Sequence, residues 1–387
     1  MRNLLITMSV LAGAVVSSCV SGTNKDVRTA SGLDPQNFVS VYDGDSTALY
    51  TLKNANGMEV CITNFGGRIV SIMVPDKAGK MQDVVLGFDS VQSYFPENNQ
   101  TDFGAAIGRY ANRINQGKFT LDGTEYQLPR NNFGHCLHGG TDMGAKGWQY
   151  RVYKMMECND STLVLGIESK DGDNGFPGTV KAQVKYTVKS DNSLDIAYAA
   201  TTDKPTIINM TNHSYFNLSG DPNKPITDQQ LTINASRYTP VDSTYMTTGE
   251  ILPVAGSPMD FTNAKLVGAE IEKRDFEQIK NGNGYDHNWV LDTNGDDTKE
   301  AVNLFCPASG IRLQVYTNEP GIQVYTGNFL DGTVKGKGGI VYQQRTGICL
   351  ETQKYPDTPN KPEWPSAVLR PGEMYHSHCI FKFSVQK

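Results

Sequence analysis

His213 and Glu351 are the two side chains whose sequence surroundings favour proton transfer. His213 lies in NMTNHSYFN at residues 209–217, and an imidazole can donate and accept protons near neutral pH. Glu351 interrupts the apolar run GICLETQ at residues 347–353, where burial of an unpaired carboxylate would raise its pKa. Each residue also has an ordinary structural explanation: a strand histidine with satisfied hydrogen bonds, and a strand-end glutamate that faces water.

Further polar side chains cluster in short Gly-rich or aromatic motifs. Asn112 and Arg113 stand in GRYANRI, His138 in LHGG, and Asp286 with His287 in GYDHN. Taken singly, each could be a turn residue or a member of a salt bridge.

A metal site is not predicted. His138, His213 and His287 lack the HxH or HxxxH spacing of a ligand pair, and the chain has no CxxC unit. The acidic turn at residues 292–297 lacks the sixth-position Gly and the distal Glu of an EF-hand loop. The sequence leaves open whether a structural calcium ion is bound.

Alternation of apolar and polar residues predicts the elements that carry these side chains. Period-two runs at residues 180–188, 194–200, 311–317 and 379–385 are typical of half-buried antiparallel strands. Gly/Asn/Asp clusters separate the runs, and residues 263–280 are the best helical candidate. We therefore expect an all-β fold: one large antiparallel β-sandwich over residues 38–387.

The N-terminus predicts export. A short basic start and an apolar run, too short to span a bilayer, indicate a signal peptide over residues 1–18. VSSC at residues 16–19 resembles a bacterial lipobox, which would acylate Cys19; an ordinary signal peptide is the alternative. Residues 19–37 are predicted to form a flexible tether. The expected product is a periplasmic or outer-membrane-attached lipoprotein that meets the membrane only through this anchor.

Composition and missing motifs exclude several function classes. The net charge is -6 without a basic cluster, which argues against nucleic-acid binding. The sequence has no GxSxG, P-loop or strand-linked dinucleotide fingerprint, so the common hydrolases, NTPases and dehydrogenases are disfavoured.

Taken together, the motifs resemble the galactose mutarotase (aldose 1-epimerase) family. Those already quoted are joined in order by DNGFPG at 173–178, EPGIQVYTGN at 319–328, and LETQ continuing to YPD at 355–357. The resemblance covers about residues 38–387 and implies that family's large antiparallel β-sandwich, the mutarotase-like supersandwich.

The resemblance also implies an activity: interconversion of the α and β anomers of free aldoses such as glucose and galactose, by acid/base ring opening and reclosure. It makes Glu351 the general base and His213 the general acid, and it assigns the binding of sugar hydroxyls to Asn112, Arg113, His138, Asp286 and Gln323. The chemistry requires no cofactor. The expected partner is a monosaccharide, and the expected state is a monomer.

Three alternatives remain open at this point. The first is a non-catalytic carbohydrate-binding lipoprotein on the same fold, because fold does not fix function. The second is an epimerase for hexose 6-phosphates, which would need additional Arg or Lys. The third is a glycoside hydrolase in which Glu351 and Asp286 form the carboxylate pair.

Overall fold

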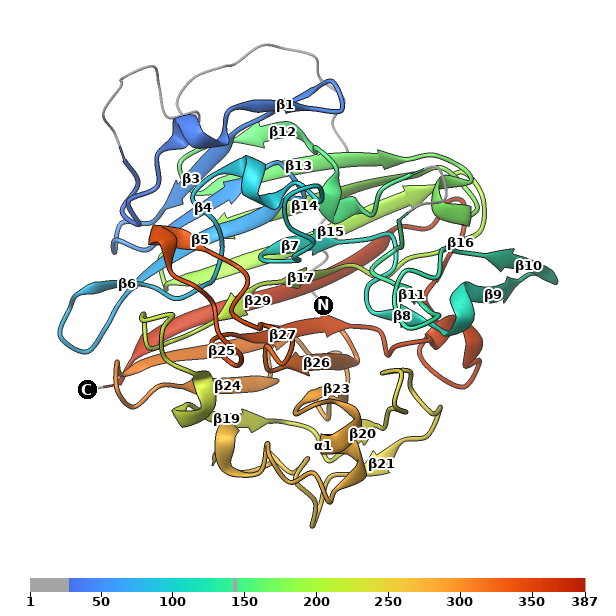
Figure 1. Ribbon diagram of the computed structural model, residues 1–387. Helices are drawn as coiled ribbons and strands as arrows, with labels where there is room; N and C mark the ends of the chain where they lie inside the picture. The colour runs from blue at the N-terminus through green and yellow to red at the C-terminus, as the bar shows by residue number, and fades with distance from the viewer. Residues whose placement is uncertain (1–27, 142–144, 387) are drawn as a thin grey trace.

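The computed structural model describes residues 28–141 and 145–386, and the regular secondary structure of this part of the chain is mostly β strand (Figure 1). The largest sheet has nine strands, in the order β12 (Lys154–Cys158), β13 (Thr162–Ser169), β14 (Val180–Val188), β15 (Ser193–Thr202), β29 (Tyr375–Val385), β25 (Ile311–Thr317), β24 (Val302–Phe305), β19 (Gln230–Ile233) and β22 (Lys265–Leu266). All its neighbouring strands pair antiparallel.

Two smaller sheets complete the sandwich. A six-stranded sheet has the order β18 (Tyr215–Phe216), β27 (Ile348–Gln353), β26 (Gly321–Tyr325), β23 (Asp286–Val290), β20 (Arg237–Thr239) and β21 (Leu252–Pro253). A four-stranded sheet consists of β3 (Leu49–Lys53), β4 (Glu59–Thr63), β5 (Arg68–Pro75) and β6 (Met81–Asp83). One apolar core joins them, with Val184 from the nine-stranded sheet, Leu350 from the six-stranded sheet and Ile72 from the four-stranded sheet.

Five short pairs of strands form separate two-stranded sheets beside these three sheets. Two of them carry predicted site residues: β7 (Ala105–Ile107) with β17 (Thr211–His213), and β8 (Arg113–Ile114) with β11 (Cys136–Leu137). The other three are β1 (Ser40–Tyr42) with β2 (Asp45–Thr47), β9 (Lys118–Leu121) with β10 (Thr124–Gln127), and β16 (Thr206–Ile207) with β28 (Val368–Leu369).

The predicted all-β class is confirmed, and the alternating pattern explains it locally. In β14 the side chains of Val180, Ala182, Val184, Tyr186 and Val188 are buried, while the residues between them are partly or fully exposed. The helical candidate at residues 263–280 was mostly wrong. That stretch forms β22, a 3-10 turn and all but the last residue of the short helix α1 (Glu277–Asn281), which is the sole α-helix in the described part of the chain.

The N-terminal part of the structure differs from the predicted tether over residues 19–37. From Arg28 onward the described chain lies against the sandwich: the amide of Ala30 donates to Glu59, and Leu33 and Phe38 are buried. Burial of the apolar side chains at these positions offsets the conformational entropy that is lost when the segment becomes ordered. The signal peptide and Cys19 lie outside the described residues. Among the residues described, no helix has the length and apolar character needed to cross a membrane.

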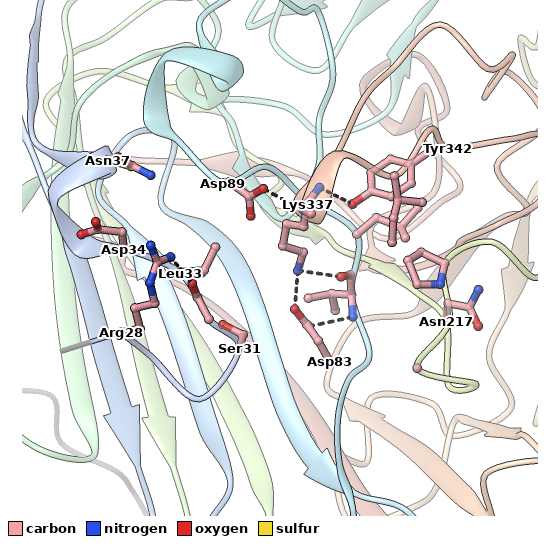
Figure 2. Close-up of a pocket in the computed structure, with 17 residues that line it drawn as sticks. Arg28, Ser31, Leu33, Asp34, Asn37, Asp83, Asp89, Asn217, Lys337 and Tyr342 are labelled. Atoms are coloured by element: carbon pink, nitrogen blue, oxygen red, sulfur yellow. Dashed lines mark hydrogen bonds and ion pairs between the residues drawn. The ribbon is translucent and has the colours of Figure 1, made fainter. Parts of the chain in front are cut away.

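This N-terminal segment forms one wall of a pocket of about 470 Å³. Figure 2 shows the opposite wall, where the ammonium of Lys337 points toward Asp83. None of the predicted site residues lines this pocket.

Candidate active site

Three neighbouring strands of the six-stranded sheet place predicted site residues on one face. Gln323 in β26 lies directly opposite Glu351 in β27, and Tyr325, two residues further on, lies opposite Asp286 in β23. Because side chains alternate along a strand, this register sends Glu351, Gln323 and Asp286 to the same side. It sends the intervening Val324 and Leu350 to the apolar core.

The carboxyl groups on this face are buried, and part of their hydrogen-bonding capacity is unused. The Gln323 amide donates to Oδ1 of Asp286 at 2.7 Å. Oε2 of Glu351 and Oε1 of Gln323 are buried and have no hydrogen-bond partner among the described residues. Buried polar atoms of this kind are costly, so these two oxygens are sites where a polar ligand could bind.

His213 reaches Glu351 from a different element. β17 pairs with β7, opposite Ala105, and packs against β27. Nε2 of His213 lies 3.6 Å from Oε1 of Glu351, and Nδ1 lies 3.5 Å from the Cys349 thiol. The ring stacks on Tyr215 with centroids 5.2 Å apart. The predicted acid and base therefore face each other in one buried site.

The strand pair β8 and β11 brings Asn112 and His138 together. The His138 amide donates to the Asn112 carbonyl, and the Asn112 amide donates to Nδ1 of His138 at 3.2 Å. A neutral His138 ring therefore carries its proton on Nε2. The rings of His138 and His213 meet edge to face at 5.2 Å, which places His138 beside the proposed proton donor.

Arg113 is buried at the same site with its guanidinium already oriented. Nε and Nη2 both donate to Oδ1 of Asn132, at 3.1 and 3.0 Å. The guanidinium lies over the ring of Tyr245, 5.2 Å from the centroid, a distance suited to a cation–π contact. A fixed arginine can donate to a sugar hydroxyl without losing further side-chain entropy.

Burial moves the pKa values of the catalytic candidates in opposite directions. It raises the pKa of Glu351 well above its usual range; Asp286 and Asp102 add to this effect, and Arg113 opposes it. It lowers the pKa of His213, which Asp102 partly restores. The unliganded site therefore favours a protonated Glu351 beside a neutral His213.

The binding candidates follow the same rule. Burial raises the pKa of Asp286, opposed by Arg113 and the Gln323 amide. Burial, His213 and Arg113 together lower the pKa of His138 well below its ordinary value. His138 is thus a neutral hydrogen-bonding group at physiological pH.

The structure adds three residues that the sequence motifs do not mark: Asp102, Asn132 and Tyr245. Asp102 is the most consequential, because ligand atoms of Asp102, His138 and His213 all lie within 4.8 Å of one another. Its only signal in the sequence is an acidic residue three positions before the apolar strand β7, whose partner strand carries His213.

Tyr215 and Trp148 stand in or near the quoted motifs and are candidates to pack on a sugar ring, but of these two only Tyr215 lies beside His213. Trp148 is buried in the apolar core, closely packed on Gly108.

Two overlapping groups in the site have the donor types that hold a metal ion. One is Asp102, His138 and His213; the other is His213, Cys349 and Glu351, with ligand atoms again within 4.8 Å of one another. His138 and His213 are far apart in sequence, so spacing alone gave no hint of the first group. His287 belongs to neither: it lies on the opposite face of β23 from Asp286, and its Nδ1 accepts the Asp286 amide.

The chain is similar to known proteins over most of its length. The aldose 1-epimerase family model matches residues 48–382. Galactose mutarotase from Mus musculus is 42% identical over 90% of this chain and 97% of its own length. Aldose 1-epimerase from Escherichia coli K12 is 38% identical over 88% of this chain and 96% of its own length.

Solved structures show the same relationship. An aldose epimerase homologue from C. elegans matches with a TM-score of 0.81 and 31% identity. The match covers 88% of this chain and 100% of that chain. A galactose 1-epimerase from Lactobacillus acidophilus matches with a TM-score of 0.77 and 29% identity, covering 90% of this chain and 97% of its own. The chain therefore belongs to the aldose 1-epimerase family.

Proposed function

We propose that this protein interconverts the α and β anomers of free aldoses such as glucose and galactose, with Glu351 as general base and His213 as general acid. The observation that carries these roles is the buried pair itself, with Nε2 and Oε1 3.6 Å apart and a further Glu351 oxygen without a partner. A carboxylate and an imidazole facing one small site are what ring opening of a cyclic aldose requires.

The reaction balances with these two groups alone. Glu351 removes the proton from the anomeric hydroxyl while His213 gives a proton to the ring oxygen, and the bond between the anomeric carbon and the ring oxygen breaks. Rotation about the bond between carbons 1 and 2 presents the other face of the aldehyde. His213 then takes back the proton from the hydroxyl on the former ring oxygen, which closes the ring, and Glu351 returns its proton to the anomeric oxygen.

The shifted pKa values favour the middle of this sequence. After ring opening Glu351 is protonated and His213 is neutral, which is the distribution that burial favours in the unliganded site. The enzyme therefore stabilises the protonation state in which the open-chain sugar is held. Asn112, Arg113, His138, Asp286 and Gln323 are proposed to hold its hydroxyls.

Polarimetry on freshly dissolved α-galactose and α-glucose tests the proposal. Wild-type protein should speed mutarotation beyond the spontaneous rate, and Glu351→Gln or His213→Asn should lower kcat by about 10²–10⁴-fold, the usual worth of a positioned proton-transfer group. Glu59→Gln, at another buried glutamate far from these strands, is the matched control. Full activity in a folded Glu351→Gln variant would reject Glu351 as the base.

We further propose that the protein acts as an exported monomer anchored through an acylated Cys19. The signal-like start and the sequence VSSC at residues 16–19 support the anchor. Mass spectrometry of the mature protein should find lipid on an N-terminal Cys19, and Cys19→Ser should release the protein from membranes. A mature chain that begins elsewhere without lipid would refute the anchor and leave the enzymatic proposal intact.

A further inference from the structure

We propose that Asp102 is a positioning residue for this reaction, whose carboxylate stabilises the imidazolium form of His213. The inference rests on the proposed role of His213 as general acid. The acid step needs a protonated imidazole, whereas burial and the nearby Arg68 both disfavour a positive charge on His213.

The position of the Asp102 side chain carries the first part of the argument. A carboxylate oxygen of Asp102 lies within 4.8 Å of a ring nitrogen of His213. Oδ1 of Asp102 is buried and has no hydrogen-bond partner among the described residues. A carboxylate this close to an imidazole, with an oxygen that no donor satisfies, is available to stabilise the charged ring electrostatically.

The backbone holds Asp102 in this place. Arg68, fully buried, donates from Nη1 to the carbonyls of Thr101 and Phe103, on either side of Asp102. The Gly104 amide then donates to the His213 carbonyl at 3.0 Å. Aspartate and histidine are thus fixed relative to each other through main-chain contacts rather than through a flexible loop.

Gly104 makes the turn between them possible. Its φ is +68°, a value that favours glycine, and a Cβ built there would lie 2.0 Å from the carbonyl oxygen of Ile69. No other residue type fits this conformation without moving β5. The tight turn brings Asp102 back over the strand pair that carries His213.

The other groups around His213 leave this role to Asp102. Those facing the ring from neighbouring elements are Glu351 and Cys349 of β27, His138 after β11, Tyr215 of β18 and Tyr325 of β26. Arg68 of β5 acts on the ring electrostatically and lowers the pKa of His213. Glu351 exchanges a proton during the reaction, so its charge changes when that of His213 does. Asp102 takes no part in the exchange, and it is the carboxylate that raises the pKa of His213 against burial.

The test combines an imidazole titration with kinetics in Asp102→Asn. In sugar-free protein, NMR of labelled histidine should show the His213 midpoint moving to lower pH. In polarimetry kcat should fall, by about tenfold for each unit by which the pKa of His213 falls further than the pKa of Glu351, which Asp102 also raises, while KM changes little. Asp102→Glu, which keeps the charge, should restore a large part of the His213 titration midpoint and of kcat. Asp34→Asn, at another half-buried aspartate that caps a 3-10 turn far from the site, should match wild type.

Two results would overturn the proposal. An unchanged His213 midpoint in folded Asp102→Asn would show that the carboxylate does not act on the ring. A rise in KM with unchanged kcat would make Asp102 a sugar-binding residue instead. Absence of mutarotation in the wild-type protein would reject the proposed function separately, because the titration requires no substrate.

Discussion

The proposed proton-transfer residues, Glu351 and His213, share one proton during the reaction, and burial favours its position on Glu351. The productive state, ionised Glu351 beside protonated His213, contains as many protons as the resting state with protonated Glu351 and neutral His213. The two states are tautomers of one pair, so pH alone does not convert one into the other. The pH range of activity is therefore set by loss or gain of a proton by the pair as a whole.

This coupling predicts which group limits activity at each end of the pH range. Because the pKa of Glu351 is raised and that of His213 lowered, the alkaline limb should report loss of the proton from the glutamate. The acidic limb should report a second proton on the histidine. Unshifted groups would give the opposite assignment and a narrow acidic optimum. We expect a broad plateau in kcat/KM across neutral pH.

Infrared spectroscopy checks the assignment directly. A protonated carboxylic acid band should persist in sugar-free enzyme to a pH well above the usual range of a glutamate and be absent from Glu351→Gln. Loss of this band with rising pH should follow the alkaline limb of activity. A glutamate already ionised at pH 6, together with an acidic limb near pH 4, would contradict the inverted assignment.

Residue types and motifs predicted much of this site, but not its electrostatics. Glu351, Gln323 and Asp286 come together because a strand register joins their motifs, and those motifs were recognisable only as an ordered set. Asp102 could not be found this way. Its role depends on a turn at Gly104 and on Arg68, which reaches it from another sheet. Such contacts are non-local and leave no pattern in the sequence.

At the scale of elements, short segments rather than long strands close the structure around the site. The period-two pattern predicted long strands such as β14 well, because their alternation has many repeats. Two-residue strands such as β8 and β11 carry site residues but are too short for any periodic signal. Their pairing depends on tertiary contacts such as the donation from the Asp357 amide to the Arg113 carbonyl.

The turn η8 (Lys337–Gly339) shows how such a segment is attached. Lys337 Nζ binds Asp83 at 2.6 Å (Figure 2). It also donates to the carbonyls of Val70 and Val85 at 2.7 and 2.8 Å. The ammonium thus links this turn to the four-stranded sheet. Burial raises the pKa of Asp83, and Lys337 lowers it.

Removing this ammonium should be costly. Lys337→Met leaves the partly buried Asp83 carboxylate, whose side chain is 22% exposed, without its cation, and loss of one partner of such a polar pair typically costs about 1–3 kcal/mol. Urea unfolding at pH 7 should show a loss of this order. The loss should shrink toward pH 4, where Asp83 takes up a proton and no longer buries a charge. Lys335→Met, at an exposed lysine in the same loop, is the control; a pH-independent loss would indicate a packing defect instead.

At the scale of the whole molecule, the buried ionisable groups of the candidate active site lower the free energy of unfolding of the sandwich. A large apolar core supports a face that holds Glu351, Asp286, His138 and His213, all buried. Each is disfavoured in its charged form by burial. Groups arranged for catalysis are often destabilising in this way. A substitution that replaces one of these groups by a neutral side chain of the same shape should therefore raise the free energy of unfolding and lower kcat.

Glu351→Gln is the substitution that shows this opposition most clearly. The folded-state pKa of Glu351 lies above its unfolded value. Its contribution to stability is therefore fully present below the unfolded pKa, near 4.3, and is lost as pH rises through the folded pKa. A neutral amide of the same shape removes that loss. The variant should melt at the same temperature as wild type near pH 4 and above it at neutral and alkaline pH. Each unit of pKa shift is worth about 1.4 kcal/mol, enough to move Tm by a degree or more. Differential scanning calorimetry of both proteins from pH 4 to 9 measures the difference. Glu351→Gln could instead be less stable than wild type throughout, or more stable by the same amount at every pH. Either result would show that ionisation of Glu351 does not destabilise the folded protein. The inverted pH assignment would then lose its physical basis as well.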